Sequence, residues 1–423
     1  MITELSIIDF VNKYNYDIRK THNGRWIDQK CTPDVVSFVA DCILSYIDNV
    51  GKSKYSSKEI QYYDYSNDNV KLLFKKADTK SSLSAREYDK FFQQPMKMFA
   101  NAKILSEKKI NGKNIFELKE RCILEYIALS EKNALKFIKN YIEKVLSDSE
   151  ISNEFLSFFE NQSENNFNKL KKCFIDFTHK NTNIKKEYEP KRIFTKVINP
   201  LAYFRNSKGT EDGHLTKHII TYDMLMYNRD NFRDIYLGKP KDVTRKEYLS
   251  NHPIKINEDY YTYQSEKAKK FLRSFNDECR NGLSEYIDQT HKDDKATHIH
   301  HIFPKSQYPE ICYYLENLIA LTPTQHLNYA HPNGKTQEIC LSYQHLLLLT
   351  KAERIKENIE YEKILSDKYE IIYEFSKFLH VLSVGFDNDE IETIADKDFI
   401  SVMNAINVYY AKKNNKSKSN KNI

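Results

Sequence analysis

The sequence predicts a mainly α-helical protein with small β elements, and three observations lead to this class. Long stretches carry apolar residues at helical spacing, as in residues 33–49, where Pro33 suits the first turn of a helix. Only 9 glycines and 10 prolines occur in 423 residues, which argues against an all-β or low-complexity chain. Short β-capable runs stand beside turn signals, as around Asn111-Gly112.

The composition is that of a globular protein with an ample core. Hydrophobic residues make up 40% of the chain and aromatic residues 13%, and the length suffices for two or three domains. The net charge of +6 permits a polyanionic partner without demanding one. The 7 cysteines are widely spaced and form no C-x-x-C pair, which argues against a disulfide framework or a cysteine zinc site.

The expected location is the cytoplasm, with no membrane partner. No signal-peptide pattern opens the sequence, because a charged start followed by an apolar run is missing. No window approaches the roughly 18 consecutive apolar residues that a membrane span needs.

Residues 1–150 are predicted to form a helical, winged-helix-like region that reads DNA. A β-hairpin is expected at residues 103–120, because Asn111-Gly112 lies between two β-capable runs and a type I′ turn needs two positive φ angles. Helical patterns flank the hairpin, and helix, hairpin, helix is the order around the wing of a winged helix-turn-helix. We therefore expect nucleic-acid contacts, with solvated lysines on an ordinary hairpin as the alternative, from Lys108, Lys109 and Lys113.

The flanking patterns predict particular helices. Residues 84–102 place apolar residues on one face but include Pro95, so we expect a short helix, a break near Gln94 and a second helix. Residues 120–146 continue the apolar spacing without interruption and predict one long helix.

Four further regions follow along the chain. Residues 151–285 are predicted to be a helical middle region, with a loop rich in Gly, Asn, Asp and Ser at 205–215. Residues 286–345 contain a histidine-rich unit, and residues 346–411 are predicted to form C-terminal helices packed on it. Residues 412–423 are expected to be a disordered basic tail, because they are lysine-rich and lack apolar periodicity.

Three of the 13 histidines lie within four positions, at 298, 300 and 301, in the stretch THIHHIFPKSQYP. Residues 298–303 predict a short strand, and residues 318–321 predict a second one. Thr322-Pro323 then has the features of a helix start, with threonine as N-cap and proline in the first turn. This β, loop, β, α unit is too small to bury a core alone, and a bound metal ion would help to hold it together.

Imidazole is the commonest metal ligand and titrates near neutral pH, so adjacent histidines can divide two duties. We expect His300 and His326 to bind a divalent cation and His301 to take a proton from water. Asn317, next to the second strand, would hydrogen-bond the base or its backbone. The metal would polarise a phosphodiester and stabilise the leaving 3′ oxygen. His300 and His301 point to opposite faces of a regular strand, so the strand must end or bulge there, and Pro304 favours an early end.

The pattern HHIFP…ENLIAL…QH resembles the motif of the HNH, or ββα-metal, nucleases. The resemblance implies that His301 is the general base, that His300 and His326 are metal ligands, and that Asn317 is the central asparagine. It also implies a divalent cofactor, with Mg²⁺ as the first expectation and Mn²⁺, Ni²⁺ or Zn²⁺ as alternatives that the same ligands accept.

Many members of that family place a last ligand four residues further along the closing helix, where this chain has Ala330. His331 lies one residue later and is the weaker metal-ligand candidate, because five residues on an α-helix are a poor match in angle. Just after the proposed base, Lys305 and Ser306 are candidates for phosphate contacts, with a solvated loop as the alternative.

The chain as a whole resembles bacterial HNH-type type II restriction endonucleases in GRWIDQKCTPDVVSFVADCI, AREYDKFFQQP and RIFTKVINPLAY. The resemblance implies site-specific hydrolysis of double-stranded DNA and a cognate methyltransferase in the host. Cutting both strands of a palindromic site with one catalytic centre per chain favours a homodimer.

Two other functions stay open from the sequence. One is a defence nuclease that cuts DNA or RNA without a fixed site. The other is a non-catalytic winged-helix DNA-binding protein whose histidines form a structural metal site or a hydrogen-bonded core cluster.

Overall fold

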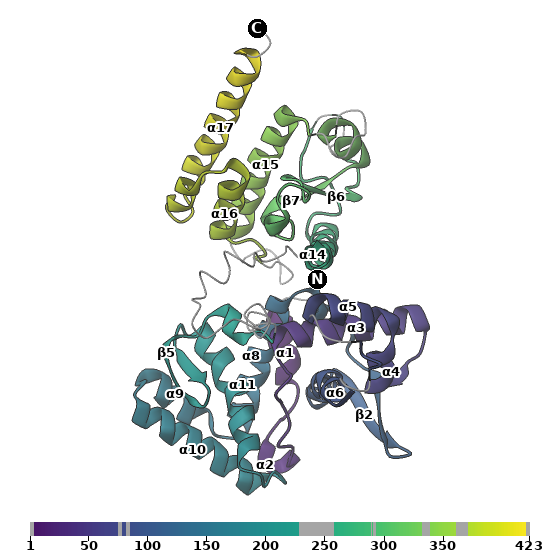
Figure 1. Cartoon of the computed structure of the whole chain (residues 1–423), viewed down its shortest axis with the longest axis vertical. Coiled ribbons are helices and arrows are strands. Elements are labelled where there is room, and N and C mark those ends of the chain that lie inside the picture. The colour runs from purple at the N-terminus through teal and green to yellow at the C-terminus, as the bar shows by residue number, and fades with distance from the viewer. Residues whose placement is uncertain are drawn as a thin grey trace, which may run out of the picture. The chain divides into compact units, whose positions relative to one another are not determined.

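The computed structural model describes residues 4–74, 78–81, 85–227, 258–288, 290, 293–331, 339–360 and 371–419. Its contacts divide the chain into two compact units, residues 2–256 and residues 257–423 (Figure 1). The described residues are mainly helical, with three small antiparallel sheets, which confirms the mainly α class. Within these ranges, no helix combines the length and the apolar character needed to cross a membrane.

The N-terminal unit is built from amphipathic helices that bury aromatic and aliphatic side chains. These helices are α1 (Glu4–Asn12), α2 (Ile18–Thr21), α3 (Pro33–Val50), α4 (Ser57–Tyr62), α5 (Asp64–Phe74), α6 (Ala85–Asn101), α7 (Arg121–Leu129), α8 (Glu131–Asp148), α9 (Ser152–Glu160), α10 (Glu164–Asn181) and α11 (Tyr188–Phe204). The helix predicted from Pro33 is confirmed as α3, with Pro33 in its first turn.

A three-stranded antiparallel sheet lies in this unit. Strands β1 (Lys54–Ser56), β2 (Leu105–Ile110) and β3 (Lys113–Leu118) pair in the order β1-β3-β2. Asn111 and Gly112 have φ angles of 49° and 77°, which confirms the predicted hairpin turn. The chain therefore runs helix α3, strand β1, helices α4 to α6, and then the hairpin, with β1 on the outer edge of β3.

Two helix predictions in this unit are wrong. Helix α6 continues through Pro95 instead of breaking near Gln94. Because Phe91, Phe92 and other apolar residues of α6 are fully buried, packing on both sides of the proline offsets the lost backbone hydrogen bond.

The predicted long helix of residues 120–146 is two helices, α7 and α8, that meet at Ser130. Ser130 has an extended backbone, with φ −157° and ψ 156°, and its side chain accepts a hydrogen bond from the Asn133 N–H. This N-cap begins a new helix in the middle of an uninterrupted apolar pattern.

The loop predicted at residues 205–215 is instead a β-hairpin. Strands β4 (Lys208–Glu211) and β5 (His214–Ile219) pair through a turn at Asp212 and Gly213, whose φ angles are 50° and 83°. Asp-Gly is a type I′ turn signal of the same kind as Asn111-Gly112, and it could have been read from the sequence. A 3₁₀ turn, Tyr222–Leu225, follows this hairpin.

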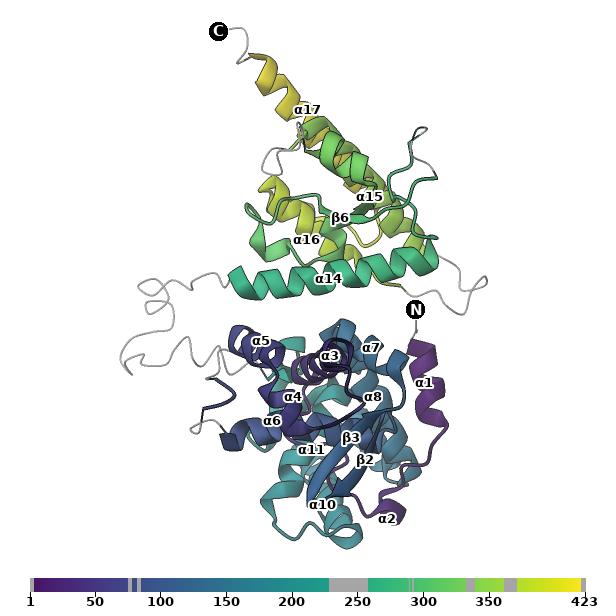
Figure 2. The same ribbon diagram turned by 90° about the vertical axis from the view of Figure 1, so that its right-hand side faces the viewer.

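In the described part of the C-terminal unit, a two-stranded sheet lies among four α-helices and a short π-helix. The elements are α14 (Glu258–Cys279), β6 (His298–His301), β7 (Leu318–Leu321), a π-helix (Gln325–Ala330), α15 (Leu341–Glu360), α16 (Phe375–Phe386) and α17 (Phe399–Ser419). Helix α14 contacts both β6 and β7 and runs along this unit in Figure 2. The sequence predicts these residues to belong to the middle region, residues 151–285. The contacts instead place them in the unit that contains the histidines, residues 257–423.

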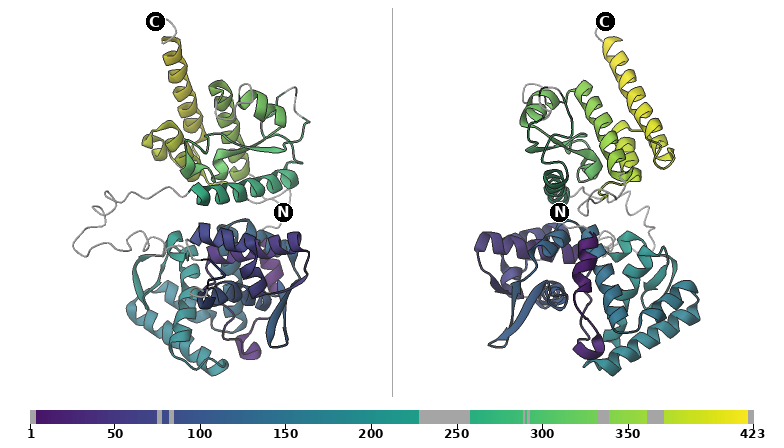
Figure 3. Two further views of the ribbon diagram at one scale, coloured as in Figure 1. Left: turned by 45° about the vertical axis from the view of Figure 1, so that its right-hand side comes forward. Right: turned by 180° about the vertical axis from the view of Figure 1, so that it is seen from behind.

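The expected disordered tail begins as part of a helix. Helix α17 continues to Ser419, and residues 420–423 lie outside the described part of the chain. Helix α17 packs alongside α15, as two views in Figure 3 show, and its anchored first turns make further helical turns inexpensive to add.

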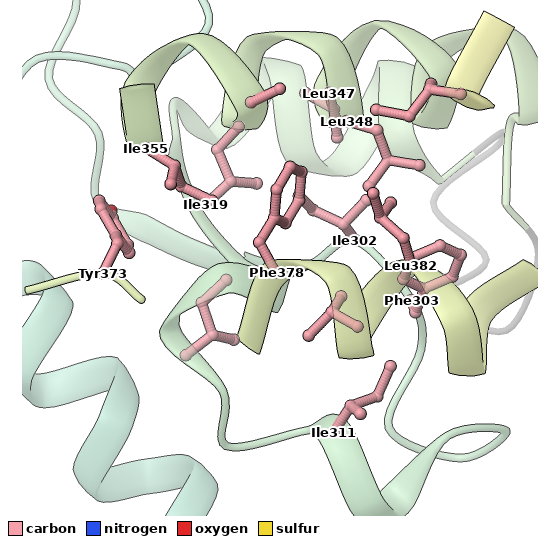
Figure 4. Close-up of a cluster of buried hydrophobic side chains, with 14 of the residues drawn as sticks. Ile302, Phe303, Ile311, Ile319, Leu347, Leu348, Ile355, Tyr373, Phe378 and Leu382 are labelled. Carbon is pink, nitrogen blue, oxygen red and sulfur yellow. The ribbon is translucent and has the colours of Figure 1, made fainter. Parts of the chain in front are cut away.

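The core of the C-terminal unit holds the small sheet in place. Ile302 and Ile319 lie between α15 and α16 in Figure 4, together with Leu347 and Phe378. Phe303, which follows β6, packs against α16 where Gly385 has no side chain, and a Cβ at position 385 would overlap the Phe303 ring. The end of β6 is thus fixed by the buried packing of Ile302 and Phe303.

Candidate metal centre and catalytic site

The sheet register brings the histidines of β6 next to the turn that follows β7. The two strands pair antiparallel, with His298 opposite Leu321 and His301 opposite Leu318. Since the chain turns into the π-helix directly after β7, that helix begins beside the start of β6. The β, loop, β, helix order expected from the sequence is present in the described residues.

Three histidines converge at this position, and we call them the histidine triad: His300, His326 and His331. One ring nitrogen from each lies within 4.8 Å of those of the other two. The ring centroids are 5.0 Å apart for all three pairs. Three convergent imidazoles are a set of donors that binds divalent transition metals.

The π-helix explains why His331 joins the triad. On an α-helix, a residue five positions further along is turned by about 140°, and this angle made His331 the weaker candidate. A π-helix instead pairs residue i with residue i+5, so side chains five apart lie nearly above one another. His331 is the C-cap directly after this helix, with φ −119° and ψ 95°. His326 and His331 come together across the last turn, while Ala330 is buried in the core.

Burial favours the neutral form of two members of the triad, His300 and His326. His300 and His331 are only 4% and 7% exposed, and His326 is half-buried. Burial lowers the pKa of His300 well below its usual value, and the neighbouring rings of His326 and His331 lower it further. Burial also lowers the pKa of His326 to about 4, with a contribution from His331. Neutral imidazole is the form that binds a metal.

His298 supports the triad from the edge of the strand. Its Nδ1 lies 2.8 Å from Nδ1 of His326, so one of these two nitrogens carries a proton and the other accepts it. This contact fixes the orientation of the His326 ring, as hydrogen bonds to metal-binding histidines commonly do.

His301 faces the other side of the strand from His300. Its Nε2 lies 3.0 Å from the carbonyl oxygen of Cys312 and 3.0 Å from Oγ of Ser265 on α14. A carbonyl oxygen only accepts, so Nε2 carries the proton and Nδ1 is the nitrogen able to take a proton from water. Strand β6 ends at His301, as Pro304 led us to expect.

The His301 imidazole is also neutral at physiological pH. Burial is the largest cause that lowers its pKa to about 4, and the charges of Lys269 and Lys305 act in the same direction. The hydrogen bond to the Cys312 carbonyl partly opposes this shift, because it stabilises the protonated ring.

Asn317 binds the loop after β6, and not the His301 ring. Its Oδ1 accepts from the Phe303 N–H at 2.8 Å, and its Nδ2 donates to the carbonyls of Phe303 and Ile311 at 3.0 and 3.2 Å. The Asn317 side chain is fully buried and cannot touch a substrate. We therefore treat it as a positioning residue that fixes the backbone two residues after His301.

The predicted phosphate contacts lie in two places. Lys305 is half-buried and donates to Oγ1 of Thr262 on α14 at 2.6 Å, while Ser306 is exposed beside it. The hairpin lysines are all exposed and lie near the β2–β3 turn of the other unit: Lys108, Lys109 and Lys113.

A hollow of about 880 Å³ lies in the N-terminal unit, and its lining contains no histidine of the triad. It lies beside the end of α6 and the start of β2, and its lining includes Lys97, Lys103 and Lys119 as well as Glu107 and Glu120. Cations and carboxylates are mixed in this lining, so its charge does not select one class of ligand.

Two residues of α14 that act on the histidines, Ser265 and Lys269, were not predicted from the sequence. Ser265 contacts His301, and the charge of Lys269 acts on both His300 and His301. No local signal marks them, because α14 lies about 30 residues before the motif and only folding brings it to β6.

Comparisons with protein-family models, with curated proteins and with solved structures find no match for this chain.

Proposed function

We propose that this chain is a divalent-metal-dependent HNH endonuclease that hydrolyses DNA phosphodiester bonds, most simply as a site-specific type II restriction enzyme. The observation that carries the proposal is the histidine triad with its neighbour His301. Three imidazoles meet on one side of β6, and the adjacent imidazole is held as a neutral base on the other.

The donors of the triad fit a borderline transition metal better than Mg²⁺. Magnesium prefers oxygen ligands, whereas imidazole suits zinc, nickel and copper. The three rings would hold the ion through one nitrogen each, and a phosphate oxygen or water could complete its ligand set. We therefore propose Zn²⁺ or Ni²⁺ as the preferred ion, in place of the Mg²⁺ first expected from the family resemblance.

Each step of phosphodiester hydrolysis is assigned to particular groups. A water oxygen attacks phosphorus, and His301 Nδ1 takes the proton that this water loses. The bond from phosphorus to the 3′ oxygen breaks, and the leaving oxygen takes a proton from solvent. A divalent ion at the triad supplies Lewis-acid stabilisation of the charge on the phosphate and the leaving oxygen. Asn317 keeps the loop after His301 in one position, so that the base stays aligned.

The N-terminal unit is proposed to read the DNA. The order helix, strand, helices, hairpin with the sheet order β1-β3-β2 is similar to that of a winged helix, and this similarity supports the proposal that a helix enters the major groove beside the wing. Helix α6 precedes the hairpin directly, and exposed Lys108, Lys109 and Lys113 decorate the hairpin turn. Phosphate contacts from such lysines would fix the register of the protein on the duplex.

One observation favours a second candidate function, a DNA-binding protein with a structural metal site. His300 and His331 are nearly buried, and a closed site that stabilises a fold has this character. That alternative predicts that chelation unfolds the C-terminal unit and that His301→Ala changes no measurable activity.

Cleavage of a random-sequence duplex DNA pool, with sequencing of the ends, tests the proposal. The purified protein is loaded in turn with Zn²⁺, Ni²⁺, Mn²⁺ and Mg²⁺. Wild type is expected to cut, and His301→Ala is expected to lose about 100-fold or more in rate while it still binds metal and DNA. His380→Ala, an exposed histidine of α16, is the matched control and should cut normally.

The ends distinguish the candidate nucleases. One recurrent sequence at the ends supports a restriction enzyme, whereas dispersed ends support a non-specific defence nuclease. If the duplex DNA stays intact with all four ions, or if His301→Ala cuts at the wild-type rate, the proposal is wrong.

A further inference from the structure

The face of α14 that lies against β6 carries a cation for which the sequence motif assigns no role. Near one end of this face, Ser265 Oγ lies 3.0 Å from His301 Nε2. Near the other end, Arg273 Nη2 donates to the carbonyl oxygen of Thr297 at 2.9 Å. Lys269 is midway, four residues from each, and residues four apart share one face of a helix.

The lengths of the two elements agree with this placement. Eight residues of α-helix rise about 12 Å, and the four steps from residue 297 to residue 301 of an extended strand span about 13 Å. Helix and strand therefore run side by side in opposite directions, with Lys269 beside the middle of β6. Its charge contributes to the lowered pKa values of His300, His301 and His326.

The surroundings of Lys269 suit an anion that arrives from solvent. Its Nζ lies 3.1 Å from Oε1 of Glu266, whose side chain is 59% exposed. An exposed ion pair between neighbours on one helix contributes at most about 1 kcal/mol, so a phosphate can displace Glu266. The Lys269 side chain is itself 28% exposed and therefore reachable.

A cation at this position is unfavourable for metal binding alone. Two positive charges that share a partly buried site repel each other. An anion bound between them compensates both charges. The combination of the triad with Lys269 is therefore better matched to a metal ion with a phosphate than to a metal ion alone.

We propose that Lys269 binds a non-bridging oxygen of the scissile phosphate where α14 runs beside β6. The inference rests on the proposed nuclease function and adds a substrate contact to it. Negative charge grows on these oxygens as water attacks phosphorus, and a positioned ammonium group stabilises that charge. Lys269 would then be a catalytic residue supplied by α14, outside the ββα unit.

Kinetics of the full-length, metal-loaded protein on duplex DNA test this proposal. Lys269→Gln is expected to lower kcat by about 100-fold, as the loss of one positioned charge-stabilising donor does in other enzymes. Lys269→Arg keeps the charge and is expected to restore part of the rate. Lys270→Gln removes the exposed neighbouring lysine, which points in another direction, and should cut at the wild-type rate.

Metal affinity, measured by calorimetry without DNA, separates this role from a structural one. Lys269→Gln is expected to bind Zn²⁺ at least as tightly as wild type, because a repelling charge is removed. If Lys269→Gln cuts DNA like wild type, or if it loses its metal, the inference is overturned. If wild type itself cuts nothing with any of the four ions, the proposed function fails first and the inference fails with it.

Discussion

His300 and His301 are neighbours in the chain, and the strand separates their roles. The alternation of side chains along β6 sends His300 into the triad and His301 toward Cys312 and Ser265. The two rings lie on opposite faces of β6, which ends at His301, and we propose that both act on one phosphate. At the scale of single residues, the proposed mechanism requires that the triad binds the ion and that His301 does not bind it.

His331→Ala and His298→Ala separate a metal ligand from a supporting residue. His331→Ala removes one of three ligands and should weaken Zn²⁺ binding more than His298→Ala does. His298→Ala removes the contact to His326 and should cost about 10- to 100-fold, as other changes behind a ligand do. Competition with a chromophoric chelator measures the Zn²⁺ affinity of both variants. An unchanged affinity in His331→Ala would show that His331 is not a metal ligand.

Asn317→Ala tests the positioning role by stability. The change leaves the Phe303 N–H and the carbonyls of Phe303 and Ile311 without the partner that they share. Because buried polar groups without partners cost about 1–3 kcal/mol each, we expect a loss of about 3 kcal/mol in the free energy of unfolding. Urea unfolding measures this loss.

Asn404→Ala is the matched control, because Asn404 is exposed on α17. Its free energy of unfolding should stay within about 0.5 kcal/mol of that of wild type. Equal stabilities for Asn317→Ala and Asn404→Ala would contradict the positioning role.

At the scale of elements, a buried ion pair joins the small sheet to α15. Lys351 is fully buried, and its Nζ contacts Glu285 Oε2 at 3.2 Å and the Tyr373 hydroxyl at 2.7 Å. Glu285 Oε1 accepts from the Ala320 N–H of β7 at 2.9 Å. One carboxylate thus bonds the strand that leads to the π-helix and a cation of the neighbouring helix.

Breaking this pair on one side should be costly. Lys351→Met leaves the Glu285 carboxylate buried without its cation, and we expect a loss of about 3–5 kcal/mol. The double variant Lys351→Met with Glu285→Gln removes both charges and should recover part of that loss. Lys356→Met, in an exposed pair on α15, should change stability by less than about 1 kcal/mol. Thermal unfolding of wild type and the three variants measures these losses. If Lys351→Met and the double variant lost the same stability, the pairing of Lys351 with Glu285 would be contradicted.

The hairpin lysines test DNA reading by the N-terminal unit. Replacing Lys108, Lys109 and Lys113 with alanine should weaken DNA binding at all sequences. The slope of log affinity against log salt should fall by about 0.9 for each lysine that contacts a phosphate. The exposed lysines of α10, replaced in the same way, are the control: Lys169, Lys172 and Lys180. Equal salt slopes in the two triple variants would show that the hairpin lysines do not contact DNA phosphates.

Local signals predicted several elements, and tertiary contacts decided the others. Asn111-Gly112 predicted the β2–β3 hairpin because the turn chemistry lies within two residues. Helix α6 continues through Pro95 because packing from elsewhere in the chain holds it. The π-helix is an element that tertiary contacts decide. Its geometry could not be predicted from the sequence, so His331 was the weaker ligand candidate although it belongs to the triad with His326.

At the scale of the whole molecule, the chain divides into two units with different proposed tasks. Residues 257–423 hold the histidine triad, and residues 2–256 hold the hairpin lysines. Calorimetry should therefore show two unfolding transitions, of which added Zn²⁺ raises only that of the C-terminal unit.

At a metal concentration of about 100 times Kd, the stabilisation is about 2.7 kcal/mol, or roughly 5–10 °C for a unit of this size. His326→Ala should abolish this shift and leave the other transition unchanged. A single transition, or a shift of both transitions, would contradict the division of tasks.

The measurement that tests the central claim most directly is X-ray absorption at the metal edge of the zinc-loaded protein. Three imidazoles around one ion predict three ring nitrogens at about 2.0–2.1 Å from zinc. In His331→Ala the number of imidazole ligands should fall to two. A protein that takes up no zinc, or a spectrum that is the same in wild type and His331→Ala, would show that the triad does not hold the ion.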